Sequence, residues 1–288
     1  MSKTRTLGWG AVSLAAAALL ASCAQTPSVP RSGLERMYVF DCGENQTNDV
    51  SGWSPGANAG KYWEFSDHCY LIRHAKGLML WDAGLSDSIA ASPEGVMRGR
   101  GAIRSIVRKT LASQLAEIGV KPEEVTHIAF SHSHADHVGN ANYFTQARLY
   151  IQEAEYEAAF SPNAAKFGFD PSNYDKLRLD AVLKLNGDYD VFGDGSVTIL
   201  STPGHTPGHQ SLLVRLPKRG AVVLSGDVTH FEDNWVNRRV PIFNFSQELS
   251  RQSMERIAAL LEVNKAQLWI NHDKAQSAGI PKSPAYVE

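Results

Sequence analysis

The sequence has little cysteine, little excess charge and no internal repeat or low-complexity segment. Only three of its 288 residues are cysteine, and 28 basic side chains stand against 30 acidic ones. Without a basic excess, the surface offers nucleic acid no electrostatic attraction. The 43% of hydrophobic residues suffice for one large α/β domain or two small ones. We expect one domain behind a short leader.

The first residues have the layout of a secretory signal. Lys3 and Arg5 precede an uncharged stretch, residues 6–23, that is dominated by Ala and Leu and is typical of an export signal. It is too short and too rich in alanine for a membrane span. The segment LASC, which ends at Cys23, resembles the bacterial lipobox, in which cleavage leaves the cysteine as a lipidated first residue. The alternative is cleavage after Ala24, which would release a soluble protein; lipidation of Cys23 is the favoured prediction.

The next ten residues, 24–33, combine Pro, Ser and Gly with almost no apolar side chain, which is typical of a flexible tether. We therefore predict a signal with lipobox over residues 1–23, a tether over residues 24–33 and a folded body over residues 34–288. Loss of Lys3 and Arg5 with the signal leaves 26 basic against 30 acidic side chains, a net charge of −4. The predicted location is the periplasm, and the resemblance to bacterial lipoproteins, with Ala24 rather than Asp after Cys23, implies the outer membrane.

The body contains two further cysteines, Cys42 and Cys69. In an oxidising periplasm they could form a disulfide. Two separate buried thiols in strands are the slightly favoured prediction.

Short apolar segments bounded by turn residues predict strands throughout the body. These segments begin at Met37, Cys69, Gly77, Thr126, Ala147, Val197, Ser211, Ala221 and Gln267. Apolar residues at helical spacing predict a helix over residues 104–118 that stops at Gly119, and Ser246 could cap a later helix. This order of elements favours an α/β (α+β) fold with two sheets sandwiched between helical layers.

Aromatic residues gather in a glycine-rich loop that contains Trp53, Tyr62, Trp63 and Phe65. They could line a pocket, although packing beneath the loop is the commoner arrangement. Tyr70 and Trp81 lie within predicted strands and are expected in the core.

The most informative segment is FSHSHADHVGN, which begins at Phe130 and contains four potential metal ligands. His132 and His134 alternate in an extended chain, so their side chains point the same way and can meet one metal. The turn that follows can present Asp136 and His137 to another. Neutral imidazole and carboxylate are the ligands that a catalytic zinc or a similar divalent ion takes. The spacing therefore predicts two adjacent metal sites.

HSHADH resembles the HxHxDH motif of the metallo-β-lactamase superfamily, whose fold is a four-layer αβ/βα sandwich. The resemblance continues in order through STPGHTPGHQSL, LSGD and WINHD. It implies that His132, His134 and His205 bind one metal, that Asp136, His137 and His272 bind a second, and that Asp227 bridges the two. It also implies that Asp82 supports the site without binding metal.

Within the superfamily, the segments VFDCG, CYLIRH, LWDAGL and TPGHTPGHQSL resemble the N-acyl homoserine lactonases. Those enzymes typically carry a tyrosine three residues after the bridging aspartate, whereas this chain has His230, which can still donate a hydrogen bond. Ala135 also stands where the lactonases can carry an aromatic residue.

The remaining histidines are expected to serve the structure. His209 follows His205 in the same segment, but the resemblance gives the ligand role to the first of the two, so His209 is expected to support the site. His68, His74 and His127 are expected to be structural or exposed.

These assignments predict a hydrolase with two divalent metal ions, zinc being expected. Attack by a metal-bridging hydroxide would open a lactone ring, most plainly that of an N-acyl homoserine lactone, in quorum quenching. Asp136 would carry the proton to the leaving alkoxide and His230 would donate to the oxyanion. The predicted partner is this small lactone, with no nucleic acid, and with a membrane only through the lipid anchor.

Three alternatives stay open at this point. A β-lactam hydrolase of the same fold is disfavoured by Asp227, because β-lactamases of the superfamily generally lack this carboxylate. A thioesterase would fit the ligands, but an exported enzyme would be poorly placed to meet cytosolic thioesters. A lipoprotein that binds metal without turnover fits least well, since the ligand set is complete.

Overall fold

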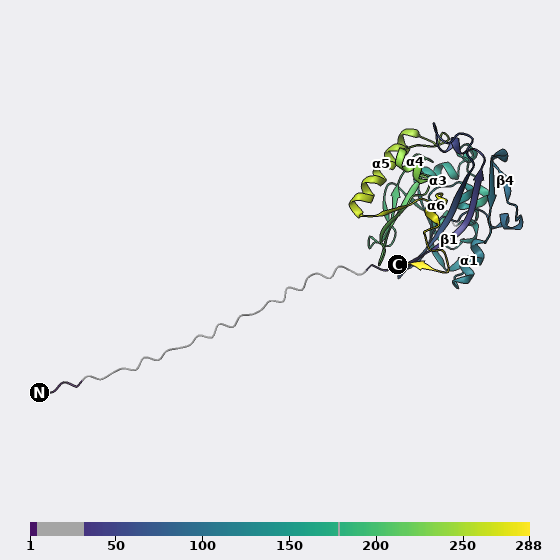
Figure 1. The fold of residues 1–288 in the computed structure, drawn as a ribbon. Helices are drawn as coiled ribbons and strands as arrows, with labels where there is room; N and C mark the ends of the chain where they lie inside the picture. Colours follow the sequence, from purple (N-terminus) through teal and green to yellow (C-terminus); the bar gives the residue numbers. More distant parts are fainter. Residues whose placement is uncertain (5–31, 178) are drawn as a thin grey trace. The chain divides into compact units, whose positions relative to one another are not determined.

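The structure, a computed structural model, describes residues 1–4, 32–177 and 179–288. The chain divides into two units, Met1–Arg31 and Ser32–Glu288, and the second holds the predicted body (Figure 1). The lipidation site at Cys23 and most of the tether lie outside the described residues. Among the described helices, none is both long enough and apolar enough to cross a membrane.

Two sheets form the centre of the body. The first has nine strands, with β14 added beside β1 to the order β4-β5-β1-β2-β3-β6-β7-β8. Its strands are β1 (Leu34–Thr47), β2 (Trp63–His74), β3 (Gly77–Trp81), β4 (Val96–Arg98), β5 (Ile103–Ile106), β6 (Val125–Ala129), β7 (Arg148–Gln152), β8 (Leu183–Leu185) and β14 (Tyr286–Val287). The second has the order β13-β12-β11-β10-β9, from β9 (Tyr189–Asp190), β10 (Val197–Ser201), β11 (Gln210–Leu216), β12 (Gly220–Leu224) and β13 (Gln267–Trp269).

Helices cover the outer faces of both sheets. The described α-helices are α1 (Leu111–Glu117), α2 (Ala135–Val138), α3 (Glu153–Ala159), α4 (Glu232–Asn237), α5 (Gln247–Asn264) and α6 (Lys274–Ser277); the last of these contacts β2 through Ser277 and His68. Leu111 and Leu115 of α1 pack against the first sheet, and Met254 and Ile257 of α5 pack against the second. In Figure 1, α5 and α1 lie on opposite sides of the two sheets. The predicted four-layer arrangement is thus confirmed.

The two inner faces of the sheets meet in one apolar core. Alternation along the strands produces it: Val39 of β1 points between the sheets, whereas its neighbour Phe40 points to the helices on the outer face, as expected for the two-residue period of a strand. Tyr70 and Trp81, 2% and 0% exposed, lie in this inner core, as expected from the sequence.

Two predictions were wrong. Residues 104–118 are not one helix: they begin within β5, and only Leu111–Glu117 are helical, after Thr110, whose side chain accepts a hydrogen bond from Ser113 N. The start of the segment lies in β5, which pairs with β1.

Cys42 and Cys69 are not separate thiols but form a disulfide, with Cα atoms 5.9 Å apart. The pairing of β1 with β2 is irregular between Asp41 and Gly43, so Cys42 occupies the bulge. Both cysteines are buried in the core between the first sheet and its helices.

Candidate metal centre

Four strands end at one edge of the sandwich, and the loops that follow them carry the expected ligands. β6 precedes residues 132–137, β10 precedes His205, and the parallel strands β12 and β13 precede Asp227 and His272. Because β10 and β12 both run antiparallel to β11, they share a direction. The carboxyl ends of the strands therefore meet, which is where open α/β sheets place their ligands.

The first expected ligand group converges closely. The Nδ1 atom of His134 lies 2.8 Å from Nε2 of His132 and 3.0 Å from Nε2 of His205. The ligand atoms of these three side chains all lie within 4.8 Å of one another. The structure thus brings together the three histidines that the sequence assigned to one metal.

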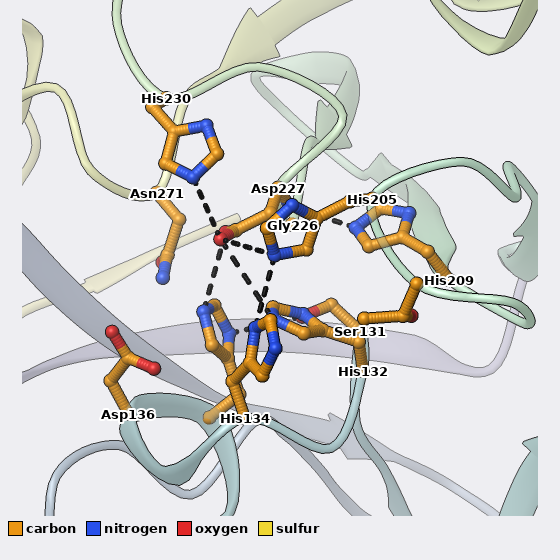
Figure 2. Close-up of polar contacts among 12 residues, drawn as sticks. Ser131, His132, His134, Asp136, His205, His209, Gly226, Asp227, His230 and Asn271 are labelled. Atoms are coloured by element: carbon orange, nitrogen blue, oxygen red, sulfur yellow. Dashed lines mark hydrogen bonds and ion pairs between the residues drawn. The ribbon is translucent and has the colours of Figure 1, made fainter. Parts of the chain in front are cut away.

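The second expected group lies beside the first. Asp136, His137 and His272 also offer ligand atoms within 4.8 Å of one another, and Nε2 of His137 lies 3.2 Å from Nε2 of His272. Asp227 reaches both groups, and Figure 2 shows its carboxylate among His132, His134, His205 and His230. Its Oδ1 lies 3.1 Å from Nε2 of His272, and its Oδ2 lies 3.3 Å from Nε2 of His205.

The outward ring nitrogens of these histidines are held by protein acceptors. His134 Nε2 donates to the carbonyl of Phe167 at 2.9 Å, and His272 Nδ1 donates to that of Ser66 at 2.7 Å. His205 Nδ1 donates to Asn244 Oδ1 at 2.9 Å. A carbonyl oxygen can only accept, so each of these nitrogens carries a proton, and in the neutral ring the inward nitrogen carries the lone pair. This tautomer is the one that binds a metal.

Asp82 supports His137 from outside the cluster. It follows β3 in a left-handed backbone conformation, φ 58°, which is uncommon for a residue other than glycine and is found at functional sites. One carboxylate oxygen accepts from Ser131 N at 2.6 Å, and the other lies 3.0 Å from His137 Nδ1. Asp82 therefore fixes both the motif loop and the orientation of a ligand candidate.

His209 has no lone pair left for a metal. Its Nδ1 donates to the carbonyl of Thr202 at 2.9 Å, and its Nε2 accepts from the backbone N–H of Asp227 at 2.8 Å. His209 thus positions Asp227. The other three histidines expected to be structural also lie apart from the cluster: His74 stacks on Phe192, His127 contacts Thr126 and His68 contacts Ser277.

Burial and neighbouring charges shift the pKa values of these histidines in opposite directions. Burial lowers the pKa of His132 and of His205 well below 6.5, which keeps both rings neutral. Burial also acts on His272, but the Asp227 carboxylate outweighs it and raises the pKa of His272 to about 9. Burial likewise opposes ionisation of Asp136, but His137 and His272 lower its pKa to about 2. Positive charge is therefore favoured beside Asp227 and Asp136.

These residues fit divalent cations. Asp227 Oδ1 is buried and accepts no hydrogen bond of regular geometry, while the neutral rings of His132 and His205 turn lone pairs toward the Asp227 carboxylate. Such atoms repel one another unless positive charge lies among them. Imidazole and carboxylate without thiolate are the donors of hydrolytic zinc sites and of similar divalent ions.

His230 lies at the edge of this cluster and lines the adjoining cavity. Its Nε2 is 3.1 Å from Asp227 Oδ2, and its Nδ1 is buried without a partner. Its ligand atom also lies within 4.8 Å of those of His205 and Asp227. The geometry therefore allows His230 to donate into the cavity, to hold Asp227 or to contact a metal.

A cavity of about 250 Å³ opens onto the cluster. Trp53, Phe65 and Phe243 give it an apolar wall, and Arg98, Asn45 and Ser105 give it a polar one. Ala135, which precedes Asp136 in the sequence, also lines it. Of the aromatic residues that the sequence analysis placed in a loop, Trp63 and Phe65 belong instead to β2. Trp63 packs on Phe231, and Tyr62 is exposed.

The family profile described as the metallo-beta-lactamase superfamily matches residues 63–262. The chain belongs to this superfamily. Among its curated relatives, the N-acyl homoserine lactonase AttM of Azorhizobium caulinodans is 33% identical over 261 residues, which are 88% of this chain and 98% of that protein. An N-acyl homoserine lactonase of a Bacillus species is 33% identical over 260 residues, 88% of this chain and 99% of that protein.

Solved structures agree with this assignment. An N-acyl homoserine lactone hydrolase, with the product N-hexanoyl-L-homoserine bound at its catalytic metal centre, matches with a TM-score of 0.77 and 28% identity, and the match covers 88% of this chain and 99% of that one. Within the superfamily, the chain therefore groups with the N-acyl homoserine lactonases.

Several residues of the site were not predicted from the sequence. Phe167 and Asn244 orient ligand histidines. Asn45 contacts Asp136 directly, and Ser105 reaches it through Asn45. No spacing pattern marks these residues, because each reaches the cluster through a contact between distant segments. For Phe243 the sequence held one indication, because it lies in the short apolar segment PIFNFS, which begins with a proline.

Proposed function

We propose that this protein is a metal-dependent hydrolase that opens the ring of N-acyl homoserine lactones and thereby quenches quorum signals. The observation that carries the proposal is the complete set of seven imidazole and carboxylate side chains at one cavity, in a chain whose relatives of nearly equal length are N-acyl homoserine lactonases. The solved neighbour that holds a ring-opened product at its metal centre supports the same substrate class.

The site has donors for two divalent cations, and we expect zinc at both. His132, His134 and His205 would hold one, Asp136, His137 and His272 would hold the other, and Asp227 would contact both. Cations in such a site acidify a water molecule and polarise the carbonyl of the substrate.

The side chains around the cluster perform the remaining steps. Asp136, which lines the cavity, would accept a proton from the attacking water and return it to the ring oxygen as the carbonyl carbon–oxygen bond breaks. The products are a free hydroxyl and a carboxylic acid, which releases its proton to solvent and leaves as the carboxylate. His230 Nε2 would donate to the oxygen on which negative charge develops. The acyl chain would lie along the wall of Trp53, Phe65 and Phe243, which is the apolar side of the cavity.

A substrate panel tests the proposal. The purified body, residues 34–288, should hydrolyse short- and long-chain acyl homoserine lactones faster than β-lactams or thioesters, and elemental analysis should find close to two divalent cations per chain. Inactivity toward every lactone under metal-replete conditions would remove the substrate assignment. One cation per chain under those conditions would remove the two-cation centre but leave the substrate open.

We further propose that the protein is exported to the periplasm and anchored by a lipid on Cys23, on the outer membrane. The signal-like leader and lipobox support this, and so does the Cys42–Cys69 disulfide, because disulfides persist in oxidising compartments. Cys23→Ser should abolish membrane association in cells and leave the specific activity of the processed body unchanged. Wild-type protein that carries no lipid label and stays in the soluble periplasm would favour ordinary cleavage instead.

A further inference from the structure

Asn45 and Ser105 form a buried polar pair beside Asp136. They are direct cross-strand partners of β1 and β5, and their exposed fractions are 7% and 0%. Ser105 Oγ donates to Asn45 Oδ1 at 2.5 Å, and Asn45 Nδ2 donates to Asp136 Oδ2 at 2.9 Å. A continuous chain of hydrogen bonds thus runs from the first sheet to a carboxylate at the cavity.

These two hydrogen bonds can run in one direction only, from Ser105 through Asn45 to Asp136. The Asn45 amide presents an acceptor at one end and a donor at the other. If it were reversed, its oxygen would face the Asp136 carboxylate, and two acceptors would meet without a proton between them. The hydroxyl of Ser105 supplies the donor that the amide oxygen needs, so both ends of the amide are satisfied only when the N–H points at Asp136.

The hydrogen bond from Asn45 sets the orientation of the Asp136 carboxylate. Asp136 forms no other hydrogen bond through its side chain within residues 32–177 and 179–288, so the amide is its only hydrogen-bonded restraint. With Oδ2 occupied by the amide, Oδ1 stays free for a cation and for a proton. A carboxylate that serves both must be held in one orientation, because a misplaced ligand costs affinity and rate.

We propose that Asn45, oriented by Ser105, is the positioning residue for Asp136. The part that concerns turnover rests on the proposed lactonase function, whereas the part that concerns cation binding does not. The role belongs to the pair, since Ser105 reaches Asp136 only through Asn45.

The test uses Asn45→Leu, Ser105→Ala and the double variant, with Gln46→Leu as the matched control. Gln46 is the next residue of β1 and pairs with Arg104, so its side chain points to the other face of the strand. Each protein is stripped of metal, titrated with Zn²⁺ against a chelator, and assayed for kcat and KM. Thermal melting reports folding.

Asn45→Leu should weaken one of the two Zn²⁺ sites by about 10- to 100-fold and lower kcat by a similar factor, the usual loss when a partner of a metal ligand is removed. KM should change less than about twofold, and Gln46→Leu should match wild type. Ser105→Ala should show a smaller loss that Ser105→Thr rescues. In the double variant, the loss should equal that of Asn45→Leu alone, because residues that act through one contact are not additive.

Three outcomes would overturn the proposal. Unchanged Zn²⁺ affinity and kcat in folded Asn45→Leu would mean that the pair only stabilises the sheet, even if the melting temperature falls. Additive losses in the double variant would mean that Ser105 acts separately. If Asn45→Leu does not fold, equal Zn²⁺ affinity in Ser105→Ala and Ser105→Thr decides against the role. Wild-type inactivity on lactones would reject the proposed function, while the Zn²⁺ titration would still decide on Asn45.

Discussion

The replacement of His230 by phenylalanine tests the step of the reaction that differs most from the lactonase pattern. His230 is 3% exposed, lines the cavity and places Nε2 beside Asp227. Phenylalanine keeps an aromatic ring of similar size but cannot donate. The lost contact is a hydrogen bond to a charged or charge-developing oxygen, which contributes about 1.5 to 4 kcal/mol. At about 1.4 kcal/mol per factor of ten, kcat should fall by about 10- to 1,000-fold.

The matched variant is His230→Tyr, which restores a donor. It should retain much of the wild-type kcat, whereas His230→Phe should not. Both are measured on one short-chain and one long-chain acyl homoserine lactone, with KM determined separately, because a residue that only shapes the cavity changes KM rather than kcat. Metal content is measured on the same samples.

Two results would refute this reasoning. If the two variants have the same kcat and differ only in KM, His230 packs at the cavity wall and donates nothing. If His230→Phe loses metal together with rate, His230 contributes to metal binding, as its proximity to the ligand atoms of His205 and Asp227 would allow.

Three further predictions concern the site and the body. Asp227→Ser should weaken cation binding and abolish most lactone hydrolysis. His209→Ala should keep the cations but lower thermal stability, because the buried Asp227 N–H loses its acceptor. Equal loss of metal in the two variants would contradict the assignment. Replacing Cys42 and Cys69 by alanine should lower the unfolding free energy in urea by about 3 to 4 kcal/mol for a span of 27 residues. Burial lowers the pKa of His68 to about 3. The unfolding free energy of the wild type should therefore fall as the pH drops from 6.5 toward 3, by up to about 1.4 kcal/mol per pH unit. In His68→Gln it should fall less steeply.

The sequence predicted the parts of the site that depend on local spacing. Four ligand candidates lie within six residues at the end of β6, and the alternation of His132 and His134 needs only an extended chain to bring their rings together. The same reasoning failed at residues 104–118, where apolar spacing suited a helix. Ser105 belongs to a strand because β1 pairs with it from 60 residues away, and no local pattern carries that information.

The disulfide escaped prediction for a related reason. Cys42 and Cys69 lie 27 residues apart, and both were correctly placed in strands. Whether they meet depends on the register of β1 against β2, which pairs Phe40 with Cys69. Cys42 itself lies in the irregularity between Asp41 and Gly43, where it meets Cys69. A shift of one residue would have turned one thiol to the opposite face of the sheet.

What the fold adds to the ligand list is the choice of ring nitrogen. His132, His205 and His272 turn Nε2 inward, whereas His134 turns Nδ1 inward, because its Nε2–H donates to the carbonyl of Phe167. His209 follows His205 in the same segment, yet both of its ring nitrogens already form hydrogen bonds to the backbone. Ligand identity at this site is therefore decided by backbone carbonyls and amides from distant loops, which leave a lone pair on some rings and remove it from another.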